Sequence, residues 1–161
     1  MCGMKFSHEI RYAADAGAVY EMLRDQAFRE EVCEVGGALA HQVRVTPSDP
    51  GMSVVVDRTM PAEGIPSFAK KFVGDKIQVV QKETWTSPTE AALDVSIPGK
   101  PGHMHGTITL TEADGETVET VAGDIKVSIP LVGGKLEGLI GDLLASALRS
   151  EGKVGAAWLS R

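Results

Sequence analysis

The sequence has few cysteines, few aromatic residues and a shortage of positive charge, and each shortage excludes a class of protein. Two cysteines, Cys2 and Cys33, are too few for a disulfide framework or for a zinc site built on cysteine alone. Lysine and arginine number 16 against 22 acidic residues, and aromatic residues make up 5% of the chain. Nucleic acids and anionic membranes bind clustered basic side chains, and single strands also stack on aromatic rings. We therefore expect no nucleic acid and no anionic membrane as a partner.

Long apolar runs are also missing. No stretch approaches the ~18 consecutive apolar residues of a transmembrane helix, so we expect no integral membrane segment. The N-terminus has no basic stretch followed by an apolar one, which would indicate a signal peptide. The hydrophobic content of 43% is nevertheless too high for a disordered chain. With no internal repeat or linker, we expect a single cytoplasmic domain over residues 1–161, whose oligomeric state stays open.

Alternating apolar and polar residues dominate the chain before residue 130. This period of two predicts seven strands, over residues 4–12, 39–46, 52–60, 76–86, 90–97, 103–112 and 116–129. The Asp114-Gly115 pair predicts a hairpin between the last two strands. Two short helices are expected after the first strand, one capped by Asp15 and one over residues 26–35. The segment 61–74 is less regular, and whether it forms a lid stays open.

The C-terminus has a different period. Residues 135–159 carry apolar side chains at spacings of three and four, which predicts a long amphipathic helix with the stripe Leu136, Leu139, Ile140, Leu143, Leu144, Ala147, Leu148 and Val154. Four glycines interrupt this helix, at positions 138, 141, 152 and 155. Each costs about 0.5–1 kcal/mol relative to alanine. Either the helix backbone lies very close to a neighbouring element, or the missing side chains leave room for a guest.

This order of elements predicts an α+β fold, in which a curved seven-stranded antiparallel sheet wraps around the long C-terminal helix. It resembles the helix-grip fold of the START and birch-pollen-allergen-like superfamily (SRPBCC), whose members commonly hold an apolar guest between sheet and helix. Residues 125–137 and the stretch Glu83-Thr84-Trp85 are also similar to an actinobacterial family of unknown function within that superfamily. The resemblance implies the fold and says little about chemistry.

Several polar residues lie on otherwise apolar strand faces. His8 shares a face with Phe6 and Ile10, and Arg58 shares one with methionines and valines. Because buried charge is costly unless paired, we expect Arg58 and Glu83 to face one another inside the sheet. The alternative places both at strand ends with solvated tips. For His8 and His41, ligand contact or acid–base chemistry competes with a partly buried ring bonded to a backbone carbonyl.

The candidate ligand-binding residues are those that the patterns place between sheet and helix: His8, His41, Met52, Arg58, Met60, Gln81, Glu83, Trp85, Met104, Leu136, Ile140, Leu143 and Leu144. His103 and His105 share a strand face, but no third ligand is set by spacing, so we expect no metal. Nucleophile-elbow, phosphate-loop and dinucleotide motifs are missing, so we expect no cofactor and identify no catalytic residue.

Three functions remain open. The first is the binding of a small hydrophobic molecule, such as a lipid, an isoprenoid, a polyketide-like compound or an aromatic compound. The second is an enzyme of cyclase, dehydratase or hydrolase type that uses Glu83 or a histidine as acid or base. The third is a ligandless domain that binds a protein. A guest burying ~300 Å² of apolar surface would gain about 7 kcal/mol before association costs. Binding therefore needs less from this sequence than catalysis does.

Overall fold

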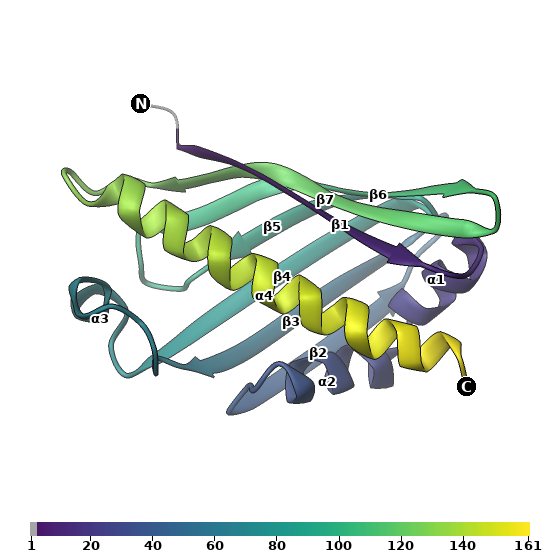
Figure 1. Ribbon diagram of the computed structural model, residues 1–161, viewed down its shortest axis with the longest axis horizontal. Helices are drawn as coiled ribbons and strands as arrows, with labels where there is room; N and C mark the ends of the chain where they lie inside the picture. Colours follow the sequence, from purple (N-terminus) through teal and green to yellow (C-terminus); the bar gives the residue numbers. More distant parts are fainter. Residues whose placement is uncertain (1–2) are drawn as a thin grey trace.

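The computed structural model describes residues 3–161, so Cys2 lies outside the described residues. Its elements follow the predicted order, with one additional short helix, α3, in the less regular segment 61–74: β1 (Met4–Tyr12), α1 (Ala16–Leu23), α2 (Gln26–Val35), β2 (Ala40–Pro47), β3 (Met52–Pro61), α3 (Ser67–Val73), β4 (Lys76–Ser87), β5 (Glu90–Ser96), β6 (Gly102–Ala113), β7 (Glu116–Val127) and α4 (Gly133–Leu159). In Figure 1, α4 crosses the sheet diagonally, with α1 and α2 near its C-terminal end and α3 near its N-terminal end.

All seven strands form one antiparallel sheet in the order β1-β7-β6-β5-β4-β3-β2. Consecutive strands from β2 to β7 pair as neighbours. The last strand, β7, also pairs with the first strand, β1, with Met4 opposite Ile125. The predicted helix-grip architecture is therefore confirmed. One strand starts later than predicted: Leu39, the first residue of the strand expected over residues 39–46, precedes β2 and is 57% exposed. It lies beside the edge of the sheet, where the core does not cover it.

Side-chain caps start the two short helices where the sequence predicts them. The Asp15 carboxylate accepts a hydrogen bond from the Ala18 amide at 2.7 Å, and the Asp25 carboxylate accepts one from the Ala27 amide at 2.9 Å. Such caps satisfy amides that have no partner within the helix. Phe28 of α2 is fully buried and packs edge-on against Trp158 of α4, with ring centroids 5.5 Å apart. Helix α2 is thereby attached to the end of α4.

Helix α4 packs closely against β1 and β7 at one side of the sheet. A Cβ atom at Gly141 would lie 2.8 Å from Met4, one at Gly152 would lie 3.0 Å from Ile10, and one at Gly155 would lie 2.5 Å from the Tyr12 ring. These three glycines therefore permit close approach to β1. A Cβ at Gly138 would meet nothing within 4 Å.

The contrast between these glycines yields a stability prediction. The change Gly155→Ala should lower the free energy of unfolding by about 1–3 kcal/mol, because the new methyl group forces the buried Tyr12 ring and α4 apart. The change Gly138→Ala should raise it by up to about 1 kcal/mol, because alanine favours the helix and fills open space. Urea unfolding of both variants measures the difference. Equal effects of the two substitutions would contradict the close packing of α4 on β1.

Among residues 3–161, no helix combines the length and the apolar character that a bilayer crossing requires.

Candidate ligand-binding site

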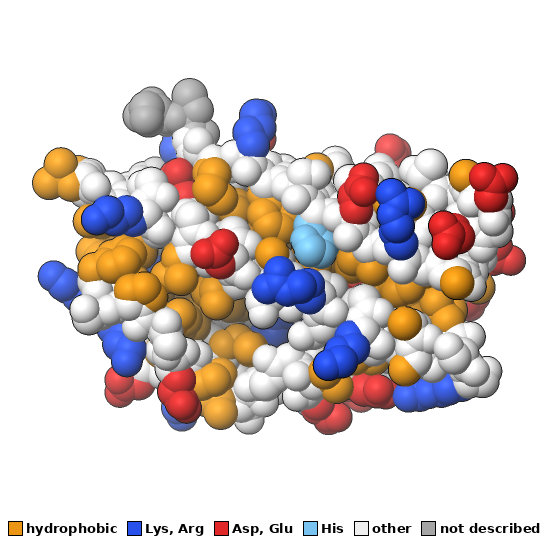
Figure 2. Space-filling model, in the orientation of Figure 1, with side chains coloured by type: hydrophobic (Ala, Val, Ile, Leu, Met, Phe, Trp, Pro, Cys, Tyr) orange, Lys and Arg blue, Asp and Glu red, His pale blue; other side chains and the backbone are white. Residues whose placement is uncertain are grey.

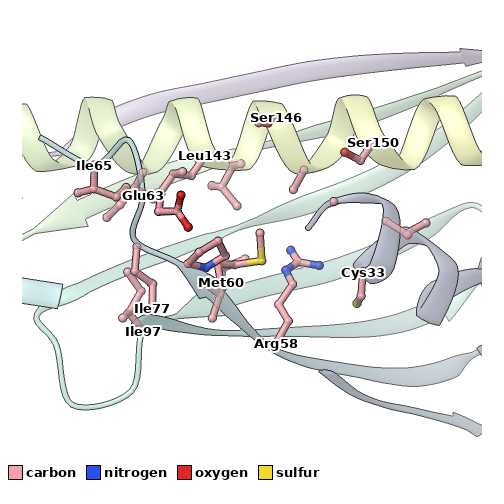
Figure 3. Close-up of a pocket in the computed structure, with 18 residues that line it drawn as sticks. Cys33, Arg58, Met60, Glu63, Ile65, Ile77, Ile97, Leu143, Ser146 and Ser150 are labelled. Atoms are coloured by element: carbon pink, nitrogen blue, oxygen red, sulfur yellow. The ribbon is translucent and has the colours of Figure 1, made fainter. Parts of the chain in front are cut away.

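A cavity of about 270 Å³ lies between α4 and the β3–β5 part of the sheet. Figure 3 shows its wall, and in Figure 2 hydrophobic side chains gather around the first half of α4, toward α3. The wall is formed by Val32, Cys33 and Gly36 at α2, Arg58, Met60 and Pro61 of β3, Glu63 and Ile65 of the following segment, Ile77 and Val79 of β4, Val95 and Ile97 at β5, and Ile140, Leu143, Leu144, Ser146, Ala147 and Ser150 of α4. The space exists because α4 lies toward β1 and leaves the opposite side of the sheet uncovered.

Five of the sequence-predicted site residues line this cavity, namely Arg58, Met60, Ile140, Leu143 and Leu144. Three others, Gln81, Glu83 and Met104, line a separate void of about 20 Å³. Arg58 also lines that void, so its side chain stands at the boundary between the two spaces.

The other five predicted residues lie elsewhere. His8 is half-buried on β1, on the side of the sheet that α4 covers. His41 is on the edge strand β2, with Nε2 3.4 Å from Glu34 Oε2. Met52 and Trp85 are 1% and 2% exposed and belong to the solid core, and Leu136 packs with the residues around α3. Alternation predicts the face of a strand that a side chain occupies, but not whether the core is solid or hollow at that point.

None of the site residues predicted from the sequence lies on α2, yet Val32 and Cys33 line the cavity. Cys33 is 2% exposed, and burial raises the pKa of its thiol, so it remains protonated at neutral pH. Val32 and Cys33 share the apolar face of α2 with Phe28. Only the placement of α2 beside α4 turns part of that face toward the cavity.

The expected pairing of Arg58 with Glu83 is corrected by the structure. Glu83 pairs with Arg29 of α2 instead: Nη1 and Nη2 donate to the two carboxylate oxygens at 2.8 Å each, and Nε donates to the Leu23 carbonyl at 2.7 Å. Trp85 Nε1 and Gln81 Nε2 also donate to Glu83. A signal for Arg29 was present, since it precedes Val32 and Cys33 by three and four residues and so shares their helix face.

The Arg29–Glu83 pair is charged despite its burial. Burial raises the pKa of Glu83, but the Arg29 charge and the hydrogen bonds from Arg29, Trp85 and Gln81 outweigh it and hold that pKa below its usual value. Burial likewise opposes the charge on Arg29, and Glu83 outweighs it, so the pKa of Arg29 is raised. The pair therefore holds α2 to the inner face of β4.

A second polar group joins β1, β7 and α4. Glu119 is 1% exposed and Glu151 is 6% exposed, and both line the 20 Å³ void. The Tyr12 hydroxyl donates to Glu151 Oε2 at 3.3 Å, whereas Glu119 Oε1 has no hydrogen-bond partner within residues 3–161. Burial and the neighbouring Glu151 raise the pKa of Glu119 well above its usual range. Burial and Glu151 therefore favour the protonated form of Glu119, which the strand pattern alone did not reveal.

No group of three or more histidine, cysteine or acidic side chains within residues 3–161 is arranged to hold a metal ion. His105, one of the two histidines considered for a metal, lies with Nδ1 2.6 Å from Asp94. The chemistry that the arrangement offers is an apolar enclosure with one guanidinium at its inner boundary.

The fold matches those of solved proteins over nearly its whole length. A START superfamily protein from Mycobacterium smegmatis superposes with a TM-score of 0.61 at 14% identity, covering 94% of this chain and 97% of that one. Norcoclaurine synthase from Thalictrum flavum, solved in complex with dopamine and hydroxybenzaldehyde, gives 0.61 at 16% identity, with 94% and 85% covered. The di-domain ARO/CYC StfQ of the steffimycin biosynthetic pathway gives 0.68 at 9% identity, with 97% and 50% covered. The expected START-like fold is thus confirmed.

In sequence, the chain is 29% identical over 119 residues to the uncharacterized protein Rv0481c of Mycobacterium tuberculosis, which covers 70% of this chain and 68% of that protein. The same values hold for the uncharacterized protein Mb0491c of Mycobacterium bovis. A family model described as a protein of unknown function, DUF2505, matches residues 7–159. The chain therefore belongs to the DUF2505 family.

Proposed function

We propose that the protein binds one small, largely apolar molecule in the cavity between α4 and β3–β5. The observation that carries this proposal is the wall itself, which is mostly aliphatic and contains two charged residues, Arg58 and Glu63. Ligand sites usually combine such an apolar lining with a few polar groups that orient the guest. Met60 adds an adaptable side chain to this wall.

The volume limits the size of the guest. An apolar cavity of about 150 Å³ holds a benzene ring, so 270 Å³ suits a molecule with one or two rings, or a short acyl chain. Burying ~200 Å² of apolar guest surface gains about 5 kcal/mol before association costs. The START-like neighbours support the proposal, because one was solved with two aromatic compounds on the same fold.

Binding is favoured over catalysis by the position of the acidic groups. Glu63 is the carboxylate in the cavity wall, and it is exposed to solvent. The buried carboxyl groups of Glu83, Glu119 and Glu151 line the separate small void instead. A guest in the large cavity therefore meets a positive group before it meets any of these three.

Filling the cavity should abolish binding. We expect Ala147→Phe to weaken the binding of the neutral two-ring fluorescent probe 1-naphthylamine by at least about tenfold, because Ala147 lines the cavity and a phenyl ring occupies the space. The matched control is Ala156→Phe on the exposed side of the same helix, which should leave the affinity within about twofold. Fluorescence titration measures the affinity, and thermal unfolding verifies that each variant is folded.

Two outcomes would contradict the proposal: no binding of the probe to the unmodified protein, or equal binding by the Ala147→Phe and Ala156→Phe variants. If Ala147→Phe does not fold, Leu143→Trp replaces it, because Leu143 lines the cavity yet is 40% exposed and has room for a larger side chain. The same loss of affinity is expected.

A further inference from the structure

Arg58 is a buried cation without a counter-ion. Its side chain is 9% exposed, and within residues 3–161 no carboxylate oxygen lies within 4 Å of its guanidinium nitrogens. Figure 3 shows the guanidinium rising from β3 toward α4, between Met60 and Cys33. We propose that the guest carries an anionic group, a carboxylate in the simplest case, and that the Arg58 guanidinium binds it at the inner end of the cavity. This inference rests on the proposed binding function and names the chemical class of its ligand.

The two buried arginines of this protein differ in a way that supports the inference. Arg29 uses all three side-chain nitrogens, two of them on the Glu83 carboxylate. Arg58 donates one hydrogen bond to a side-chain oxygen, from Nη2 to Gln81 Oε1 at 3.2 Å. A guanidinium has five N–H donors and does not lose its charge in proteins. Most of the donors of Arg58 are therefore available, and burial without a partner is costly.

Gln81 orients Arg58 without neutralising it. The amide of Gln81 accepts from Arg58 and donates to Glu83. The charge of Glu83 is already balanced by its bidentate pair with Arg29. A planar guanidinium held in this way can bind a carboxylate through two parallel hydrogen bonds, which is the strong geometry for such a pair.

Two small voids also border Arg58, and each is too small for an organic anion. Each measures about 20 Å³, and Gln81 and Glu151 line both. That is room for about one water molecule. A guest therefore reaches Arg58 from the 270 Å³ cavity, whose wall does not include Glu151.

The second charge in the wall supports one orientation of such a guest. Glu63 is exposed, on the segment between β3 and α3, and would repel an anion held beside it. Arg58 attracts the same anion at the other end. An anionic guest is thus expected to enter with its charged end toward Arg58 and its apolar end toward Leu143 and Ile65.

Two isosteric probes test the proposal. 2-Naphthoate carries a carboxylate, and 2-naphthamide is the uncharged molecule of nearly the same shape. Calorimetric titration of the unmodified protein should give an affinity for 2-naphthoate at least about tenfold higher than for 2-naphthamide. In Arg58→Gln the preference should disappear, with the affinity for 2-naphthamide kept within about threefold. The control Arg44→Gln, an exposed arginine on β2, should retain the preference.

Each result separates this inference from the proposed function. Equal affinities of the two probes for the unmodified protein, or a preference that survives Arg58→Gln, would overturn the role of Arg58 while leaving the cavity as a binding site. Failure of both probes and of 1-naphthylamine would overturn the binding function itself. If Arg58→Gln does not fold, Arg58→Lys is used: it keeps the charge but lacks the planar fork, and the preference should fall to an intermediate value.

Discussion

Replacing Arg29 by methionine should lower the free energy of unfolding by about 3–5 kcal/mol. The substitution keeps much of the packing volume but leaves the Glu83 carboxylate, which is 2% exposed, without its cation. The pKa of Glu83 then rises, because burial is no longer countered by Arg29. In the unfolded chain Glu83 ionises at its usual pKa. Above that pKa, the ionisation of Glu83 therefore lowers the free energy of unfolding of the variant. The loss should therefore be larger at pH 7 than at pH 5.

Urea unfolding at the two pH values measures this effect, with two further variants for comparison. The double variant Arg29→Met with Glu83→Gln should regain part of the loss, since it removes the stranded charge. Arg24→Met breaks an exposed pair with Glu21 and should cost at most about 1 kcal/mol. A loss in Arg29→Met no greater than that in Arg24→Met would show that the buried pair contributes no more than an exposed one.

The change Glu119→Gln should stabilise the protein increasingly as the pH rises. Burial and Glu151 raise the pKa of Glu119 in the folded state, whereas the unfolded chain ionises it at the usual value. Between these two pKa values the folded state binds more protons than the unfolded chain does. The contribution of Glu119 to stability is therefore fully present below the unfolded pKa, and it is lost as the pH rises toward the folded pKa. Each unit of separation corresponds to about 1.4 kcal/mol. Glutamine resembles the neutral acid and does not titrate.

Denaturant unfolding between pH 4 and pH 9 tests this expectation. The difference between the Glu119→Gln variant and the unmodified protein should be small at the acid end and should grow toward the alkaline end. Glu116→Gln is the matched control, because Glu116 is exposed on the same strand and should show no such trend. A difference that does not vary with pH would show that the pKa of Glu119 is not raised in the folded protein.

Local patterns predicted the elements well because they depend on neighbours along the chain. The alternation that begins at Met4 placed β1, and Asp15 marked the start of α1 through a hydrogen bond to a residue three positions away. The glycines of α4 show the limit of such reasoning. Gly138 and Gly155 look alike in the sequence, yet one faces open space and the other faces the Tyr12 ring.

The candidate site was predictable only in part. The inner-face position of Arg58 followed from the alternation of β3, and the apolar side of α4 followed from its helical period. The sequence did not reveal the partner of Glu83. Arg29 is 54 residues away, and its helix could have packed against any of several strands. The proximity of Glu119 to Glu151 could not be predicted either, because it depends on how α4 packs against β7.

The sequence by itself determined the order of the strands and helices and the face on which most side chains lie, because periods of 2 and 3.6 residues are set by backbone geometry. Tertiary structure alone decided where the space between those faces is filled and where it is hollow. The small residues of α4 bring that helix against β1, and the sheet is wider than one helix can cover, so the remaining side stays open above β3–β5. Because α4 lies toward β1, Arg58 remains at the boundary of the cavity, whereas Arg29 forms the ion pair with the buried Glu83 carboxylate.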